Sequence, residues 1–155
     1  MTARRPTSVL FACDRNSLRS PMAAAILRAR MGTRLFVDSV GVRAGELDPF
    51  AVSVMGEIGL DITGHEPKRF DELLDSSFDV IISLSPAAQH SAVEMTRTMA
   101  CDLWFWHTLD ATAVRGNRDT ILAAYREVRD SLVRRIDEAF PLAAPAGSGA
   151  TPESP

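Results

Sequence analysis

The sequence is poor in cysteine and aromatic residues and has no excess of positive charge. Of its 155 residues two are cysteine, and Phe, Trp and Tyr together make up 6%. Seventeen Lys and Arg residues against 20 Asp and Glu residues give a net charge of −3, which argues against a strongly basic surface for nucleic acid or anionic lipid. No apolar run approaches the roughly 20 residues of a membrane-spanning helix. We therefore expect a cytoplasmic protein without nucleic-acid or membrane partners.

The two cysteines, Cys13 and Cys101, could form at most one disulfide, and neither lies in a metal-ligand spacing. The three histidines, His65, His90 and His107, are scattered, and each is interpreted as a surface or packing residue. The sequence therefore predicts neither a metal nor another cofactor. Taken alone, both thiols would be interpreted as buried packing residues, and the surroundings of Cys13 decide whether that interpretation holds.

Hydrophobic patterning predicts strands that alternate with helices. Short apolar runs typical of buried strands occupy residues 8–12, 35–40, 78–84 and 103–106. Helical spacing and Ser-Pro or Asp-Pro starts predict helices over 20–31, 48–59, 85–99 and 118–140, with a short one at 70–74. This order predicts an α/β fold: a single three-layer domain with a four-stranded parallel sheet flanked by helices on both faces. In such folds ligands bind beyond the carboxyl ends of the strands.

The predicted domain covers residues 1–140, and the last segment differs from it in composition. Residues 141–155 are rich in Pro, Ala, Gly and Ser and contain no aromatic residue. Such a composition buries too little apolar surface to fold, so we expect a disordered tail without a catalytic role.

The turn after the first predicted strand has the composition of an anion-binding site. It begins at Cys13, and five residues later Arg19 precedes the Ser20-Pro21 pair that starts a helix. The backbone of such a turn can curl its N–H groups inward, and the helix adds its positive end. Arg19 can grip two oxygens of a tetrahedral anion, and the surrounding donors favour the thiolate form of Cys13. The turn is therefore predicted to bind a tetrahedral oxyanion within reach of a nucleophile.

The segment from Val9 to Ala23, VLFACDRNSLRSPMA, resembles the phosphate-binding loop of the low molecular weight protein tyrosine phosphatases. That superfamily includes the thioredoxin-coupled arsenate reductases. The Cys-x5-Arg pattern alone is weak evidence for the family. It becomes specific when a buried strand precedes it and a Ser-Pro pair that starts a helix follows it. The resemblance extends from residue 8 to about residue 140. Within this range residues 38–41, 59–63 and 78–82 also resemble segments of the family.

The resemblance implies roles for the residues of the loop. Cys13 would be the nucleophile, Arg19 would clamp the transition state, and Asn16 would hold a left-handed turn. Ser20 would steady the thiolate, cap the helix, or do both. The residues expected to surround the substrate phosphate are Asp14, Arg15, Asn16, Ser17, Leu18 and Ser20. An acidic Asp14 disfavours a dianion unless Arg15 pairs with it.

The resemblance also implies a general acid, which the family places in an Asp-Pro pair near the end of the domain. Asp110 occupies that place, but Ala111 stands where the family has proline. A carboxylic acid at this point could protonate a leaving alkoxide or phenolate. The alternative is a loop aspartate that caps a turn.

Several positions depart from the family pattern and bear on the substrate. Leu18 replaces the second loop cysteine of many phosphatases, and the tyrosine pair after Asp-Pro is missing, with Tyr125 assigned to a helix core. Ser85 stands where arsenate reductases carry a resolving cysteine, and Cys101 is interpreted as a small buried residue. The segment 41–48 has no aromatic residue that could pack against a phosphotyrosine ring, and in this respect it resembles the arsenate reductase branch.

The leading hypothesis is therefore a phosphomonoester hydrolase of the protein tyrosine phosphatase type that works through a phosphocysteine. Its substrate would be a phosphorylated protein or a small phosphomonoester, and the chain is expected to be a monomer or weak dimer. One alternative is an arsenate reductase that uses an external thiol. The other is a non-catalytic phosphate- or oxyanion-binding protein.

Overall fold

The computed structural model describes residues 6–73 and 77–141, and its centre is a four-stranded parallel sheet. The spatial order of the strands is β2-β1-β3-β4. Their bounds are β1 (Ser8–Cys13), β2 (Phe36–Gly41), β3 (Val80–Ser83) and β4 (Asp102–Phe105). Every neighbouring pair is parallel, which confirms the predicted sheet.

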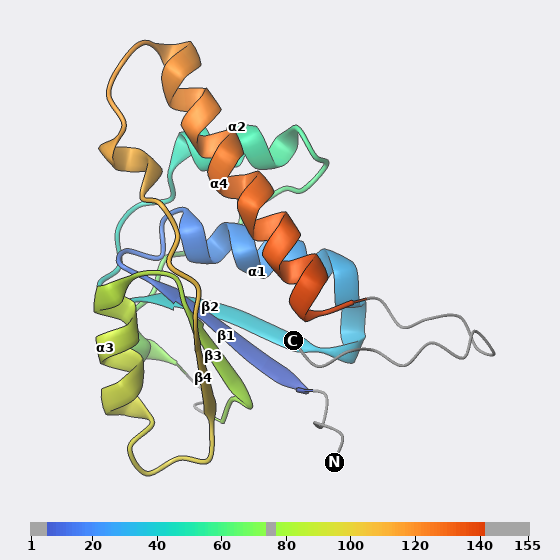
Figure 1. Cartoon of the computed structure of the whole chain (residues 1–155), viewed down its shortest axis with the longest axis vertical. Helices are drawn as coiled ribbons and strands as arrows, with labels where there is room; N and C mark the ends of the chain where they lie inside the picture. The colour runs from blue at the N-terminus through green and yellow to red at the C-terminus, as the bar shows by residue number, and fades with distance from the viewer. Residues whose placement is uncertain (1–5, 74–76, 142–155) are drawn as a thin grey trace, which may run out of the picture.

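Helices cover both faces of the sheet, so the molecule has three layers (Figure 1). One face carries α1 (Arg19–Met31), α2 (Pro49–Gly56) and α4 (Arg118–Ala139), with α4 packed against α1 and α2. The other face carries α3 (Pro86–Met95), which contacts β1, β3 and β4. Short 3-10 turns lie at Gly32–Arg34, Phe70–Glu72 and Ala111–Ala113.

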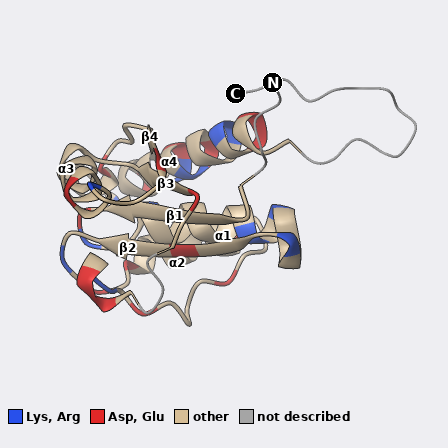
Figure 2. Ribbon diagram, turned by 90° about the horizontal axis from the view of Figure 1, so that it is seen from below, with Lys and Arg blue, Asp and Glu red and all other residues tan. Residues whose placement is uncertain are grey.

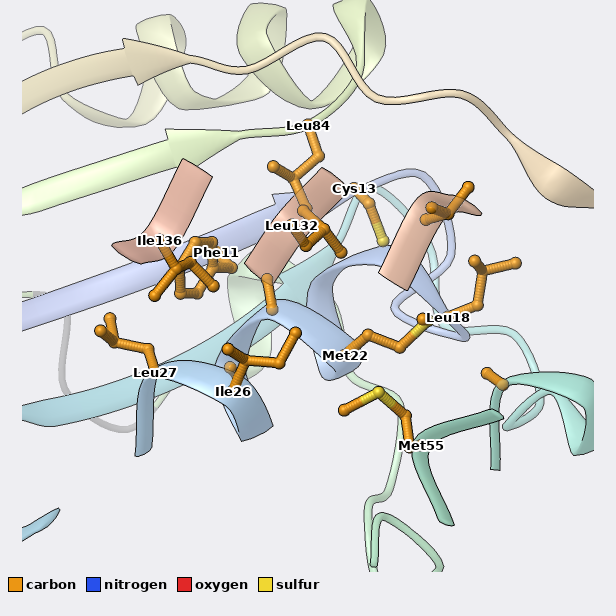
Figure 3. Close-up of a cluster of buried hydrophobic side chains, with 14 of the residues drawn as sticks. Phe11, Cys13, Leu18, Met22, Ile26, Leu27, Met55, Leu84, Leu132 and Ile136 are labelled. Carbon is orange, nitrogen blue, oxygen red and sulfur yellow. The ribbon is translucent and has the colours of Figure 1, made fainter. Parts of the chain in front are cut away.

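The central strand β1 is buried on both faces, and this explains its continuous apolar sequence. Val9 and Phe11 belong to the larger core, which α1, α2 and α4 complete. Leu10 and Ala12 belong to a second, smaller core beneath α3. Cys13 lies at the end of the larger cluster, near Leu18, Met22 and Leu84 (Figure 3). The core thus supports the backbone of the predicted anion-binding turn from below.

Two helices end earlier than predicted, because local turn geometry stops them. The helix expected over 48–59 ends at Gly56, and Gly59 has a φ of +79° in the turn that follows. The helix expected to reach residue 99 ends at Met95 and is followed by a turn. Of the predicted tail, residues 142–155 lie outside the described residues, as do residues 1–5 of the predicted domain. None of the described helices is long and apolar enough to cross a membrane.

The charge of residues such as Arg126 and Arg129 predicts a solvated face for α4, whose charged residues are coloured in Figure 2, but not all of them lie in solvent. Arg129 is buried, and its guanidinium donates to the carbonyl of Val54 and to the carboxylate of Glu57, both at 2.8 Å. Arg126 makes a bidentate contact with the carboxylate of Glu57. The two arginines therefore fasten the carboxyl end of α2 to α4.

This contact predicts a pH-dependent contribution to stability. Hydrogen bonds from Arg126 and Arg129 lower the pKa of Glu57 from 4.5 to about 2. A carboxyl whose pKa is depressed by folding stabilises the fold above its unfolded pKa, and this stabilisation disappears as the pH falls through the folded value. We expect Glu57→Gln to lower the Tm at pH 7 and to have progressively less effect between pH 4.5 and 2.

Thermal unfolding followed by circular dichroism across this pH range measures the effect. Glu127→Gln is the matched control, since Glu127 is an exposed α4 residue for which no ion pair is found among the described residues. Equal Tm losses for the two variants at pH 7 would contradict the assignment.

Candidate functional site

The turn after β1 is held open by hydrogen bonds on its outer side. The carbonyls of Cys13, Asp14 and Arg15 accept from the backbone N–H groups of residues 42, 43 and 45. The carbonyl of Ser17 accepts from Asp48 N, and the carbonyl of Asn16 lies 3.0 Å from the ring of His65. Five successive carbonyls of residues 13–17 thus face away from the centre of the turn.

The direction of these carbonyls fixes the direction of the N–H groups. In a planar trans peptide the N–H points opposite to the C=O. The N–H groups of residues 14–18 therefore point inward, and within the described part of the chain none of them donates to a protein acceptor. Inward N–H groups with no protein partner have the arrangement of an anion-binding nest.

Two glycines allow the segment 41–48 to approach the turn closely enough for these bonds. A Cβ on Gly41 would lie 2.6 Å from the backbone nitrogen of Asn16, and one on Gly45 would lie 2.6 Å from Ser17 Oγ. A side chain at residue 41 would meet backbone atoms and push the segment off the turn, whereas one at residue 45 would require the Ser17 hydroxyl to move. The two glycines therefore serve the close approach of this segment to the turn.

Asn16 has the left-handed conformation that the resemblance implied, with a φ of +56°. Its buried amide nitrogen donates to Ser20 Oγ at 2.8 Å and to Ser39 Oγ at 2.9 Å, and its amide oxygen accepts from Lys68 N. Asparagine tolerates this backbone region better than most residues. Asn16 lies behind the turn and fixes its shape; it does not line the cavity in front.

Ser20 does not cap the helix, contrary to one of the two expected roles. Helix α1 begins at Arg19 with Leu18 as its N-cap, and Ser20 lies inside the first turn. Its hydroxyl lies 2.9 Å from Cys13 Sγ and donates to the carbonyl of Val40. Like Asn16, Ser20 lies outside the cavity lining, so it contacts the sulfur from behind.

Arg19 is anchored by two elements that are distant in the sequence. Its guanidinium is almost completely buried, donates to the carbonyl of Thr108 at 3.0 Å, and lies 3.4 Å from the Asp14 carboxylate. In the described structure Asp14 pairs with Arg19, and no ion pair between Asp14 and Arg15 is found there. The charge of Asp14 is therefore compensated within the turn, and Arg15 remains exposed at its mouth.

A cavity of about 760 Å³ opens in front of the turn and brings the main predicted residues together. Cys13 lies 2% exposed at its base. Of the predicted residues it also contains Asp14, Arg15, Ser17, Leu18, Arg19 and Asp110. Its remaining lining comes from residues 46–50, Thr112 and Tyr125. A buried thiol, a guanidinium and a carboxyl thus share one space.

Asp110 lines the cavity and also caps a turn, which is the alternative role expected for it. One carboxylate oxygen accepts from Thr112 N at 3.0 Å and from Thr112 Oγ1 at 2.6 Å, capping the 3-10 turn Ala111–Ala113. Burial raises the pKa of Asp110, but the bonds from Thr112 and the charges of Arg19 and Arg15 outweigh it and lower the pKa overall. Ala111, which replaces proline, is fully buried in the core.

The part of the cavity wall that includes Asp48, Phe50 and Tyr125 was not predicted from the sequence. The Tyr125 hydroxyl donates to the Asp48 carboxylate at 2.5 Å, and the Tyr125 ring lies 5.3 Å from that of Phe50. Burial and the Asp48 carboxylate raise the pKa of Tyr125, which keeps the hydroxyl a donor. The helical spacing of Tyr125 correctly indicated a buried ring, but no sequence signal pairs it with a residue so distant. His65, expected to be a surface or packing residue, instead contacts the turn at Asn16.

We expect Asn16→Ala to lower the free energy of unfolding by about 3 kcal/mol, since several buried hydrogen bonds are lost together. Ser39→Ala removes one of these bonds and is expected to cost about 1 kcal/mol. Urea denaturation of both variants measures the difference. Equal losses would show that Asn16 is not the shared anchor of the turn.

Comparisons with known proteins agree with this geometry. The sequence model described as "Low molecular weight phosphotyrosine protein phosphatase" matches residues 8–138. An arsenate reductase of Halalkalibacterium halodurans is 30% identical over 129 residues, which cover 83% of this chain and 91% of that protein.

Two solved structures share the fold over almost their whole length. An arsenate reductase in its phosphate binding state superposes with a TM-score of 0.71 at 27% identity, covering 84% of this chain and 94% of the other. A low molecular weight protein tyrosine phosphatase from T. tengcongensis gives a TM-score of 0.70 at 26% identity, with coverages of 84% and 95%. With its sequence matched from residue 8 to residue 138, this chain belongs to the low molecular weight phosphotyrosine protein phosphatase family of cysteine-based enzymes.

Proposed function

We propose that the protein hydrolyses phosphomonoesters through a phosphocysteine intermediate on Cys13. The observation that carries the proposal is the single cavity that contains the thiol of Cys13, the guanidinium of Arg19 and the carboxyl of Asp110. The inward N–H groups of residues 14–18 add donors for the equatorial oxygens of a phosphoryl group.

In the first step the Cys13 thiolate attacks phosphorus in line with the leaving oxygen. The S–P bond forms as the P–O bond breaks, and Arg19 and the N–H groups of the turn hold the other phosphoryl oxygens. Asp110, in its protonated form, gives its proton to the leaving oxygen. The products are phosphocysteine, a free alcohol or phenol, and the Asp110 carboxylate.

In the second step water attacks the phosphocysteine and Asp110 takes its proton. The S–P bond breaks, inorganic phosphate forms, and the sulfur leaves as thiolate. The Ser20 hydroxyl lies 2.9 Å from Cys13 Sγ, and by turning its single proton from the Val40 carbonyl to the sulfur it can stabilise the departing thiolate.

The cavity wall favours an aryl leaving group. The rings of Phe50 and Tyr125 line the cavity with their centroids 5.3 Å apart. Aromatic rings pack favourably against another ring, either offset-stacked or edge to face. A phosphorylated tyrosine in a protein or a small aryl phosphate is therefore the proposed substrate, in the cytoplasm, where a free thiol stays reduced.

Arsenate reduction with an external thiol is the second candidate, because several curated relatives are named arsenate reductases. A relay within the chain is disfavoured by the position of Cys101. The register places residue 102 of β4 beside Val80 and Val9, so Cys101 lies at the amino end of the sheet. Cys13 lies at the carboxyl end of the sheet, and the rise per residue of a strand places it about 15 Å from Cys101. A disulfide needs Cα atoms within about 7 Å of each other.

A pre-steady-state assay with an aryl phosphate tests the proposal. We expect the wild type to release a burst of phenol followed by steady turnover, since phosphocysteine forms before it is hydrolysed. Cys13→Ser and Arg19→Ala should each abolish both phases, and Asp110→Asn should slow turnover by about 100-fold, the lower range of general acid catalysis.

Wild-type protein that is inert toward aryl phosphates would refute the phosphatase. Consumption of arsenate dependent on added glutathione or a similar thiol would then favour the reductase. Phosphate binding without either activity would indicate a non-catalytic binding protein.

The hydrogen bond from Thr112 predicts a change in pH profile. Thr112→Val removes the hydroxyl donor to Asp110, so the pKa of Asp110 should rise. Because a general acid works in its protonated form, kcat/KM for an alkyl phosphate should begin to fall at a higher pH in this variant. Thr112→Ser, which keeps the hydroxyl, is the control. Identical profiles for the two variants would show that Asp110 is not the acid.

A further inference from the structure

The guanidinium of Arg19 has one carboxylate partner among the described residues, and that partner belongs to the phosphate-binding turn itself. Asp14 Oδ2 lies 3.4 Å from Arg19 Nη2, while Nη1 of the same side chain donates to the carbonyl of Thr108. The Arg19 side chain is 7% exposed, so its orientation depends on these two partners. The carbonyl alone would leave the group free to rotate about a single hydrogen bond.

Asp14 is itself held in place from the other side of the sheet. Its side chain is 43% exposed, and its Oδ1 accepts from Ser85 Oγ at 2.6 Å. Ser85 is buried and fixed, because the same hydroxyl accepts from Ala88 N and caps α3. A continuous chain of contacts therefore runs from the amino end of α3 through Ser85 and Asp14 to Arg19.

We propose that Asp14 is a positioning residue that holds the Arg19 guanidinium in its anion-binding orientation, and that Ser85 holds Asp14. A carboxylate beside an anion site has two opposite effects. Its charge repels the phosphate dianion, whereas its contact with Arg19 fixes the donor that the dianion needs. Both oxygens of Asp14 are engaged, which reduces the repulsion, and preorganised donors bind without an ordering cost. The contact with Arg19 outweighs the repulsion.

The inference rests on the anion site of the proposed function but is tested without turnover. Titration calorimetry with inorganic phosphate measures the affinity of the site directly. We expect Asp14→Ala to weaken phosphate binding about tenfold, the order of magnitude of one charged contact. Ser85→Ala should weaken it in the same direction although it removes no charge. The double variant should be no weaker than Asp14→Ala, because both changes act through one contact.

Two further variants separate positioning from charge and from folding. Glu46→Gln removes one negative charge from the same cavity and leaves Arg19 anchored, so it should bind phosphate at least as tightly as the wild type. Adding Ser85→Asp to Asp14→Ala should restore affinity, since a carboxylate at residue 85 reaches the space that Asp14 vacates and is an equally good helix cap. A melting curve confirms that each variant is folded.

Tighter or unchanged phosphate binding by Asp14→Ala would overturn the proposal, as would failure of the Ser85→Asp change to restore it. Wild-type affinity in Ser85→Ala would refute the part assigned to Ser85. If the wild type binds no phosphate, the proposed function is overturned as well. If the wild type binds phosphate and the variants bind it with the same affinity, only this inference is overturned.

Discussion

The site depends on the outward direction of five carbonyls in the turn after β1. Each of them accepts a hydrogen bond from the segment 42–48 or from His65, and this leaves the N–H groups of residues 14–18 for a ligand. Nothing in the turn's own sequence achieves this, because an isolated turn would hydrogen-bond with water on both sides. The close approach of Gly41 and Gly45 and the left-handed conformation of Asn16 follow from the same requirement. Contacts on the outer side of the turn therefore set the direction of the donors that would face an anion.

Much of the fold and part of the site could be predicted from the sequence. Apolar runs located all four strands. For β1 the reason is that a strand covered on both faces needs a continuous apolar segment, whereas β4 is an edge strand and is at most half-buried. The spacing of Cys13 and Arg19 located the turn, because the residues that define the turn are neighbours in the sequence. Helix ends were less accurate, since they depend on turn geometry such as the positive φ of Gly59.

The remaining site residues escaped prediction because they act over long sequence separations. Tyr125 was correctly assigned to a buried helix face, but its bond to Asp48 depends on how α4 lies across α2. Arg129 was assigned to solvent from its charge, yet its stem is buried and its head reaches Glu57. Ser20 has the composition of a helix cap, but the helix starts one residue earlier and its hydroxyl faces Cys13 instead. Composition and spacing describe what a side chain can do, and packing decides which partner it finds.

The bond between Tyr125 and Asp48 also bears on how the protein acquires its site. The two residues are 77 positions apart, and Tyr125 belongs to the last helix of the described chain. Four of the five outward carbonyls of the turn accept from the segment 42–48, which is close to the turn in the sequence. The part of the cavity lined by Tyr125 exists only once α4 has docked. A ligand that needs both therefore stabilises only the completed fold, and its binding couples the first strand to the last helix during folding.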